Sequence, residues 1–330
     1  MARARNSQID LSATPFYHVI NRCVRRCYLC GEDFYSGKNY DHRRKWLLKR
    51  IKFLSTVFSI DIAAYAIMSN HYHLVIHVDT ARAIKWSDDE IVSRWYQLFK
   101  GNPLVDNYKL GDKLSAAQSK AVTKIISIWR TRLYDISWFM KCLNEYIARA
   151  ANKEDQCTGK FWEGRFKSQA LLDDIALLSC MAYVDLNPIR AHIADSLETS
   201  DFTSIQERLV QYRSHQKFSQ RKSSYSDINI CQQPSTLLPL STQYLSSEIP
   251  LIIGEYLALV DWSSRCIVKS KQGVEDNNLP DIFSKMAIEL DDWLETIRNF
   301  RRQYGSFAGS KQTLLRCAHA HGHEWYKGVG

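Results

Sequence analysis

The stretch DIAAYAIMSNHYHLVIHV, residues 61–78, decides the fold expected for this chain. Residues 61–68 and 71–78 are rich in apolar, β-branched and aromatic side chains, a composition that favours strands. Ser69 and Asn70 lie between them and are typical turn residues. The stretch therefore predicts two consecutive strands joined by a tight turn.

The sequence on both sides adds two more strands and a helix. Residues 14–22 and 165–171 have the composition of strands. Residues 38–58 predict a helix, because Leu47 and Ile51 begin a series of apolar side chains spaced by three or four positions.

Another helix is expected after the strand at 165–171. Asp173 or Asp174 can cap its start, because a short acidic side chain accepts hydrogen bonds from the first free backbone N–H groups. The helix is expected to run to about Asn187, where Pro188 stops it. This order of strands and helices predicts an α+β fold with a mostly antiparallel sheet.

The patterns also predict a division into domains. Residues 1–210 are expected to form the α+β domain, with a helical insertion at about 80–135. Residues 211–248 are rich in Ser, Gln and Pro and are interpreted as a linker. Residues 249–330 show helical patterns and predict a small helical domain of unknown role.

Composition and length limit the class of protein. The chain has 330 residues, of which 45% are hydrophobic and 24% charged, which is typical of globular proteins. It lacks the run of about 18 apolar residues that a transmembrane helix needs. No apolar segment follows the basic start, so no secretory signal is expected. We therefore expect a cytoplasmic protein, with reduced thiols for its nine cysteines.

The positive charge is concentrated near the start of the chain. The net charge is +9, and residues 1–60 hold 12 Lys and Arg against 4 Asp and Glu. Such a concentration favours a polyanionic partner such as nucleic acid, although a solvated basic surface would have the same composition.

His71 and His73 are the most specific local signal. Side chains two positions apart in a strand project from the same face, so the two imidazoles are expected side by side. Such a pair can begin a divalent-metal site. A strand that carries two incidental histidines is the alternative.

Tyr183 and Asn187 form a second signal. They are four positions apart in the expected helix and so share one face. Taken alone, a tyrosine in such a position is more often a core residue with a satisfied hydroxyl than a nucleophile.

Four stretches together resemble the REP-associated tyrosine transposases, a branch of the single-tyrosine HUH transposases. HYH matches the family's His–hydrophobe–His motif. The matching stretches are YHVINR (17–22), IMSNHYHL (67–74), GKFWEGRFKS (159–168) and YVDLNPIRA (183–191). Ser69 stands where the family has proline. The matches occur in the family's order over about residues 14–200.

The resemblance implies a fold and a reaction. The fold is a ferredoxin-like antiparallel sheet with helices. The reaction is cleavage of single-stranded DNA, in which the hydroxyl of Tyr183 attacks a backbone phosphorus and leaves a 5′-phosphotyrosine and a free 3′-OH. Rejoining by another 3′-OH makes the protein a strand transferase, and hairpin-forming repetitive DNA is the implied substrate.

The resemblance also implies a metal ion. His71, His73 and Asn187 would bind Mg²⁺ or Mn²⁺, which polarises the phosphate. Pro188 disfavours the helical conformation at Asn187, so the spacing from Tyr183 to Asn187 is expected to be loosened.

Single-stranded DNA is expected to bind along basic and aromatic residues. Aromatic and basic side chains alternate in the stretch before the tyrosine helix, and further arginines lie at the end of the first strand and at the start of the first helix. The residues expected to contact DNA are Arg22, Arg25, Arg26, Arg43, Arg44, Trp162, Arg165 and Lys167.

Two alternatives remain open. A domesticated transposase could bind DNA hairpins and regulate without cleavage. A metal-dependent hydrolase could use His71 and His73, but the chain offers no series of further metal-binding residues on later strands. The sequence leaves the oligomeric state, monomer or homodimer, undecided.

Overall fold

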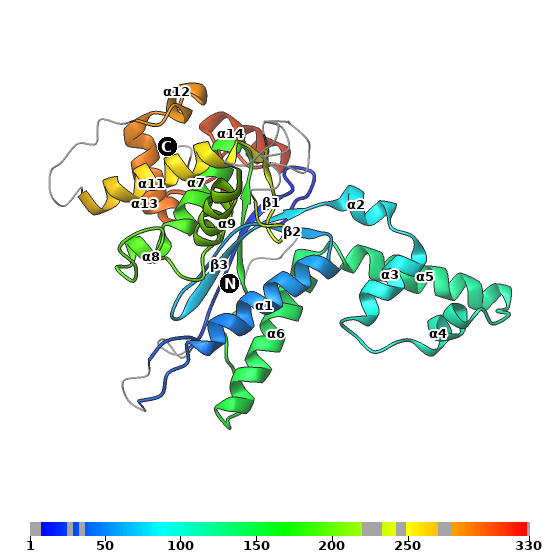
Figure 1. Cartoon of the computed structure of the whole chain (residues 1–330). Coiled ribbons are helices and arrows are strands. Elements are labelled where there is room, and N and C mark those ends of the chain that lie inside the picture. The colour runs from blue at the N-terminus through cyan, green and yellow to red at the C-terminus, as the bar shows by residue number, and fades with distance from the viewer. Residues whose placement is uncertain are drawn as a thin grey trace. The chain divides into compact units, whose positions relative to one another are not determined.

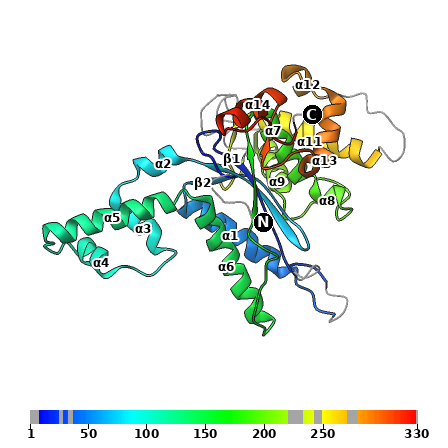
Figure 2. The ribbon, with the colours of Figure 1, turned by 180° about the vertical axis from the view of Figure 1, so that it is seen from behind.

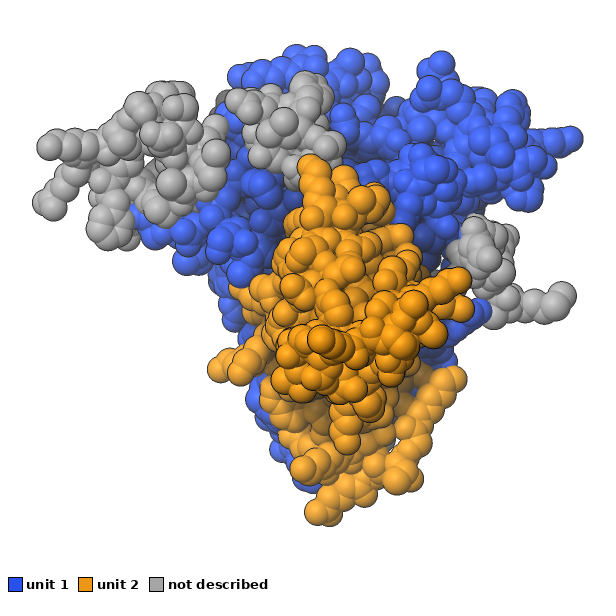
Figure 3. All heavy atoms as spheres, turned by 90° about the vertical axis from the view of Figure 1, so that its right-hand side faces the viewer, with its two compact units in different colours: residues 1–44, 62–77, 163–330 blue, residues 45–61, 78–162 orange. Residues whose placement is uncertain are grey.

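The structure is a computed structural model that describes residues 8–24, 29–32, 37–219, 233–241, 249–269 and 279–328. The chain forms two compact units, coloured separately in Figure 3. Unit 1 comprises residues 1–44, 62–77 and 163–330, and unit 2 comprises residues 45–61 and 78–162. Unit 2 therefore interrupts unit 1 twice along the sequence.

Unit 1 is built on a five-stranded sheet of order β2-β3-β1-β4-β7, of which β1, β2 and β3 are labelled in Figure 1. The strands are β1 (Phe16–Arg22), β2 (Ile60–Ile67), β3 (His71–Val78), β4 (Lys167–Leu171) and β7 (Phe307–Ala308). Strand β1 is antiparallel to both of its neighbours, β3 and β4, whereas β7 joins β4 in parallel. The predicted α+β class and its strands are confirmed, except for the short β7, which was not expected. A separate pair, β5 (Leu240–Ser241) and β6 (Ile249–Pro250), is parallel.

Seven helices of the described residues belong to unit 1 (Figures 1 and 2). They are α7 (Asp174–Asp185), α8 (Asn187–Arg190), α9 (Ser204–Ser219), α11 (Ile253–Lys269), α12 (Ile282–Lys285), α13 (Leu290–Gln303) and α14 (Lys311–Ala320). Helix α7 is buried continuously from Ala176 to Asp185. A helix that is buried on all sides needs partners on all sides, and α13 packs directly against it.

The predicted cap of α7 is confirmed at Asp173, whose carboxylate accepts a hydrogen bond from the Ala176 N–H at 2.9 Å. The helix ends at Asp185, two residues earlier than expected. A separate helical turn, α8, begins at Asn187 and holds Pro188 in its first turn. Proline is tolerated there because the N–H that it lacks has no partner inside the helix.

The C-terminal segment, for which the sequence predicts a small helical domain, contributes strand β7 to the sheet of unit 1. The Leu172 N–H donates to the Ala308 carbonyl at 2.8 Å, and Phe307 pairs with Ala170. This segment therefore completes the sheet of unit 1. Part of the predicted linker, residues 220–232 and 242–248, lies outside the described residues.

A buried carboxylate fixes the C-terminal end of α7. Asp185 accepts hydrogen bonds from the Ser204 hydroxyl at 2.5 Å, the Ile205 N–H at 2.9 Å and the Tyr256 hydroxyl at 2.5 Å. Burial raises the pKa of the Asp185 carboxyl to about 6, while these donors and Arg208 oppose the rise. The carboxylate thus connects α7 to α9 and α11.

We expect Asp185→Ala to lower the free energy of unfolding by roughly 3 kcal/mol, because three buried donors lose their acceptor. Urea unfolding followed by circular dichroism measures the change. Asp195→Ala is the matched control, since Asp195 is exposed, and it should leave stability within about 0.5 kcal/mol of the wild type. Equal stability of the two variants would contradict the role of Asp185.

Unit 2 consists of helices. It holds α2 (Thr80–Lys85), α3 (Asp88–Tyr96), α4 (Pro103–Leu110), α5 (Ala116–Arg132), α6 (Ile136–Glu154) and most of α1 (His42–Val57). Trp95 of α3 stacks on Trp129 of α5 with ring centroids 5.4 Å apart. Asn102 caps α4, and Gly111 ends it in the left-handed conformation at a φ of 79°. No helix in the described parts of the chain is long and apolar enough to cross a membrane.

Candidate active site

One face of the sheet in unit 1 gathers polar residues from three strands. The register places Ile20 of β1 opposite His73 of β3 and opposite Lys167 of β4. Arg22 lies opposite His71 in the same way. Directly opposite residues share a face, so the two histidines, Arg22 and Lys167 lie on one face of the sheet.

His18 is a third histidine of this face, which sequence reasoning did not select as a site residue. Its Nε2 lies 2.9 Å from Nδ1 of His73, and the two rings stack with centroids 5.1 Å apart. The signal that could have found it was its position in the expected first strand, two residues before Ile20. That signal has meaning only once the register with β3 is known.

A chain of hydrogen bonds assigns the protons on these rings. Gln169 donates from Nε2 to the Gly305 carbonyl at 2.9 Å, so its Oε1 is free to accept from Nδ1 of His18, 3.4 Å away. Nε2 of His18 then accepts from Nδ1 of His73. This assignment leaves Nε2 of His73 as a lone pair, and that atom is buried without a hydrogen-bond partner.

His71 is the same tautomer as His73, with its proton on Nδ1, but a different residue accepts the hydrogen bond from that proton. Its Nδ1 lies 2.6 Å from Oδ1 of Asn70, an acceptor, so Nδ1 carries the proton. Asn70, interpreted as a turn residue, therefore also orients a site histidine. The Nε2 atom of each histidine in the pair is consequently the one left to act as a ligand or base.

All three histidines are neutral at physiological pH. Burial, together with the positive charges of Arg22 and Arg301, lowers the pKa of His71 to about 4. Burial lowers the pKa of His18 to about 3, and burial together with the two neighbouring histidines holds the pKa of His73 well below its usual value. Neutral imidazoles with a free lone pair are the form that binds metal ions.

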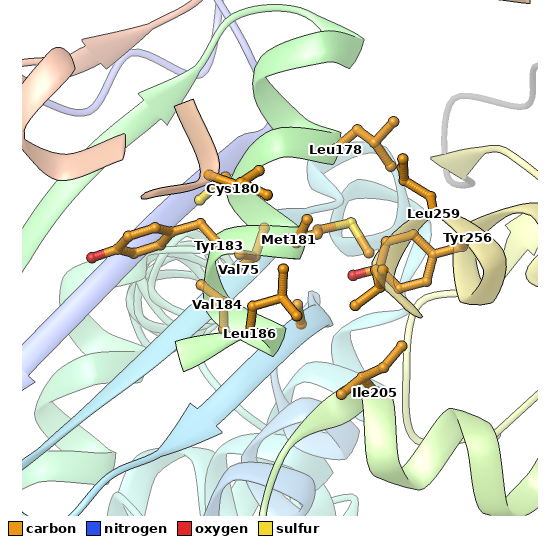
Figure 4. Packing of buried hydrophobic residues seen from close by; sticks show 14 of the residues in the cluster. Val75, Leu178, Cys180, Met181, Tyr183, Val184, Leu186, Ile205, Tyr256 and Leu259 are labelled. Atoms are coloured by element: carbon orange, nitrogen blue, oxygen red, sulfur yellow. The ribbon is translucent and has the colours of Figure 1, made fainter. Parts of the chain in front are cut away.

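Tyr183 of α7 lies beside these histidines. The centroid of its ring is 5.8 Å from that of His73 and 6.1 Å from that of His18. The Arg190 guanidinium lies over the ring at 4.2 Å from its centroid, and Phe300 of α13 packs against it at 5.7 Å. Figure 4 shows the Tyr183 hydroxyl pointing away from the apolar cluster around α7. The structure therefore brings the tyrosine and the histidine pair together.

Asn187 is buried in α8, one turn beyond Tyr183. The structure does not join its side chain to His71 or His73 by a hydrogen bond. Across the described ranges, no group of three or more His, Cys, Asp or Glu side chains is placed to hold a metal ion. The two free Nε2 atoms fit a divalent ion, and further ligands would have to be oxygen atoms such as that of Asn187.

Three hollows open on this part of unit 1, and Arg301 of α13 lines all of them. The first, of about 300 Å³, has Arg22, Arg165 and Lys167 in its wall. The second, of about 510 Å³, has Tyr183 and Arg190 in its wall. The surroundings of the tyrosine are thus strongly basic.

The predicted DNA-contacting residues are placed unevenly. Arg22, Arg165 and Lys167 are exposed and line one hollow. Arg44 forms an ion pair with Asp41 at 3.1 Å. Arg25 and Arg26 lie outside the described residues.

Arg43 and Trp162 do not fit the expected surface role. Arg43 is fully buried, with its guanidinium 4.0 Å from the centroid of the Tyr40 ring. Trp162 is buried, and its indole N–H donates to the Asn144 carbonyl at 2.9 Å. A buried side chain cannot contact a DNA backbone in solvent, so neither belongs to the basic surface proposed below.

No protein-family model and no curated protein sequence matches the chain. Among solved structures, the chain is similar to one described as "Structure of the REP associates tyrosine transposase bound to a REP hairpin". The identity is 11%, the match covers 59% of this chain and 79% of that chain, and the TM-score is 0.36.

Proposed function

We propose that the protein is a metal-dependent endonuclease and strand transferase, a transposase, that acts on single-stranded or hairpin DNA in the cytoplasm. One observation carries the proposal: Tyr183 stands beside His73, whose Nε2 is free, at the edge of a hollow lined by arginines. A tyrosine, a histidine pair and a basic surface together are what cleavage of a phosphodiester by a tyrosine needs.

In the proposed reaction the Tyr183 oxygen attacks a backbone phosphorus. A new bond forms between phosphorus and the tyrosine oxygen, and the bond between phosphorus and the 3′-oxygen breaks. The tyrosine proton passes to solvent or a nearby base, and the leaving 3′-oxygen takes up a proton. The protein then carries a 5′-phosphotyrosine, and attack by another 3′-OH reverses the step and joins strands.

His71 and His73 would hold Mn²⁺ or Mg²⁺ through Nε2, with Asn187 as a further oxygen ligand. When bound, the ion supplies charge that stabilises the phosphate oxygens in the transition state. Asn70 and His18 orient the two imidazoles through their Nδ1 protons. Partners of this kind fix the tautomer of a metal-binding histidine.

The finer fold assignment belongs to the same proposal. The order β2-β3-β1-β4, with α1 between β1 and β2 and helices between β3 and β4, agrees with the ferredoxin-like arrangement that the sequence motifs imply. The exposed Arg22, Arg165 and Lys167 would contact DNA phosphates.

A covalent-capture experiment tests the proposed function. The wild-type protein is incubated with Mn²⁺ and a pool of hairpin oligonucleotides with randomised flanks, labelled at either the 3′ or the 5′ end. We expect the 3′-labelled strand to migrate with the protein in a denaturing gel and the 5′-labelled strand to be released with a 3′-OH. Binding of the pool without any adduct would overturn the cleavage proposal in favour of a DNA-binding regulator.

A further inference from the structure

We propose that α13 and Arg190 build a phosphate-binding site for the DNA backbone beside Tyr183, so that the C-terminal segment completes the active site. The inference rests on the proposed function for its ligand, single-stranded DNA. Neither the sequence motifs nor the resemblance assigns this role to α13, which the sequence placed in a domain of unknown function.

The hollow beside Tyr183 has the chemistry of an anion site. Its volume is about 510 Å³. It is lined by Tyr183, Arg190, Arg298, Asn299, Arg301 and Arg302. No carboxylate is among these lining residues, so four guanidinium groups meet at one concave surface without an internal counter-charge. A phosphodiester backbone supplies the missing negative charge.

Arg190 is held ready for such a ligand. Its Nη2 donates to the Arg298 carbonyl at 2.9 Å, and its guanidinium lies over the Tyr183 ring. Its Nη1 is buried and has no hydrogen-bond partner. A buried donor without an acceptor costs free energy, and a phosphate oxygen in the hollow would remove that cost.

Helix α13 presents its arginines on one face. Arg301 and Arg302 lie three and four positions after Arg298. All three are exposed, and within the described structure their side chains form no ion pair. The opposite face is anchored by buried Ile297 and Phe300. Phe300 contacts Tyr183, with ring centroids 5.7 Å apart, so the arginines are fixed relative to the nucleophile.

Arg301 connects this hollow to the one formed by Arg22, Arg165 and Lys167. A strand could therefore pass Tyr183 with phosphates held on both sides of the attacked position. The competing explanation is local, because arginines in the last turn of α13 also stabilise the negative end of the helix dipole.

The test compares how strongly DNA binding depends on salt concentration in two double variants. Arg298→Ala with Arg302→Ala removes two charges from the hollow, and Lys311→Ala with Arg316→Ala removes two exposed charges from α14. Fluorescence anisotropy with a labelled single-stranded oligonucleotide, in EDTA and at several salt concentrations, gives the slope of log K against log salt. Each phosphate contact on a single strand contributes about −0.7 to that slope.

We expect the α13 variant to flatten the slope by about 1.4 and to weaken binding, while the α14 variant keeps the wild-type slope. An unchanged slope in the α13 variant, with a lowered melting temperature, would overturn the inference and leave only the dipole role. Covalent capture by the wild type separates this inference from the proposed function. If no adduct forms but the salt slope of the α13 variant still flattens, the phosphate-binding site is supported and the nuclease activity is not. If an adduct forms while the slope is unchanged, the phosphate-binding site is contradicted and the nuclease activity is not.

Discussion

Tyr183→Phe should abolish the covalent DNA adduct while leaving DNA binding and folding stability close to those of the wild type. Loss of the hydroxyl removes the only atom of this side chain that can bond to phosphorus. No described residue forms a hydrogen bond with that hydroxyl, so its removal leaves no buried group unsatisfied. The phenyl ring keeps its contacts with His73 and Phe300. Denaturing gels, anisotropy and thermal unfolding measure the three properties.

Tyr256→Phe is the matched control for this experiment. Tyr256 is a fully buried tyrosine on the other side of α7, and its hydroxyl donates to Asp185 at 2.5 Å (Figure 4). The substitution should keep the adduct but lower the free energy of unfolding by about 2 kcal/mol, because a hydrogen bond to a carboxylate is lost. An adduct that persists in Tyr183→Phe would remove Tyr183 from the role of nucleophile.

His71→Ala should lower cleavage by at least about a hundredfold while DNA affinity in EDTA changes little. Loss of a metal ligand removes charge stabilisation of roughly 3 kcal/mol from the transition state, whereas phosphate contacts elsewhere supply most of the affinity. EDTA should stop the wild-type reaction, and added metal should restore it. Mn²⁺ should restore more than Mg²⁺, because imidazole nitrogen is a poorer ligand for Mg²⁺.

His321→Ala provides the control for the metal experiment. His321 is half-buried, its Nε2 lies 2.8 Å from Oδ2 of Asp10, and it is not among the residues that line the hollow beside Tyr183. We expect this variant to retain wild-type cleavage and metal dependence. Full cleavage by the wild type in EDTA, or an equal loss of cleavage in His71→Ala and His321→Ala, would contradict the metal-dependent mechanism.

The central strands and the tyrosine helix could be predicted because their signals are local. The composition of residues 71–78, the turn at Asn70 and the cap at Asp173 each depend on a few neighbouring residues, and the structure has them at or within a few positions of the expected places. The proximity of His73 and Tyr183 was expected only from the resemblance of motifs, since more than a hundred residues separate them.

The contributions of His18 and α13 to the site could not be predicted from the sequence. Helix α13 is recognisable as amphipathic, but no residue near it in the sequence indicates that Phe300 packs against Tyr183. The β7 strand has two residues, and its parallel pairing with β4 depends on contacts far apart in the chain. Register and tertiary packing, which decide such contacts, are long-range properties.

The pattern of basic and aromatic residues led to a wrong prediction of surface exposure at two positions. Arg43 and Trp162 have the residue types of a DNA surface, yet both side chains are buried. A guanidinium that stacks on a tyrosine ring and an indole that bonds to a carbonyl are as stable inside a protein as outside. Residue type alone does not distinguish the two placements.

The packing of α13 against α7 also sets the point during synthesis at which the hollow beside Tyr183 can be completed. Synthesis runs from the N-terminus, and the elements already made can begin to fold before the rest emerges. His71, His73 and Tyr183 leave the ribosome more than a hundred residues before Phe300 and Arg301. Until α13 has been made, one side of the largely apolar α7 is uncovered, and the hollow beside Tyr183 lacks three of its four arginines. A chain stopped before α13 would thus carry Tyr183 without the wall that surrounds it, and only a chain that extends to Arg302 has the complete pocket.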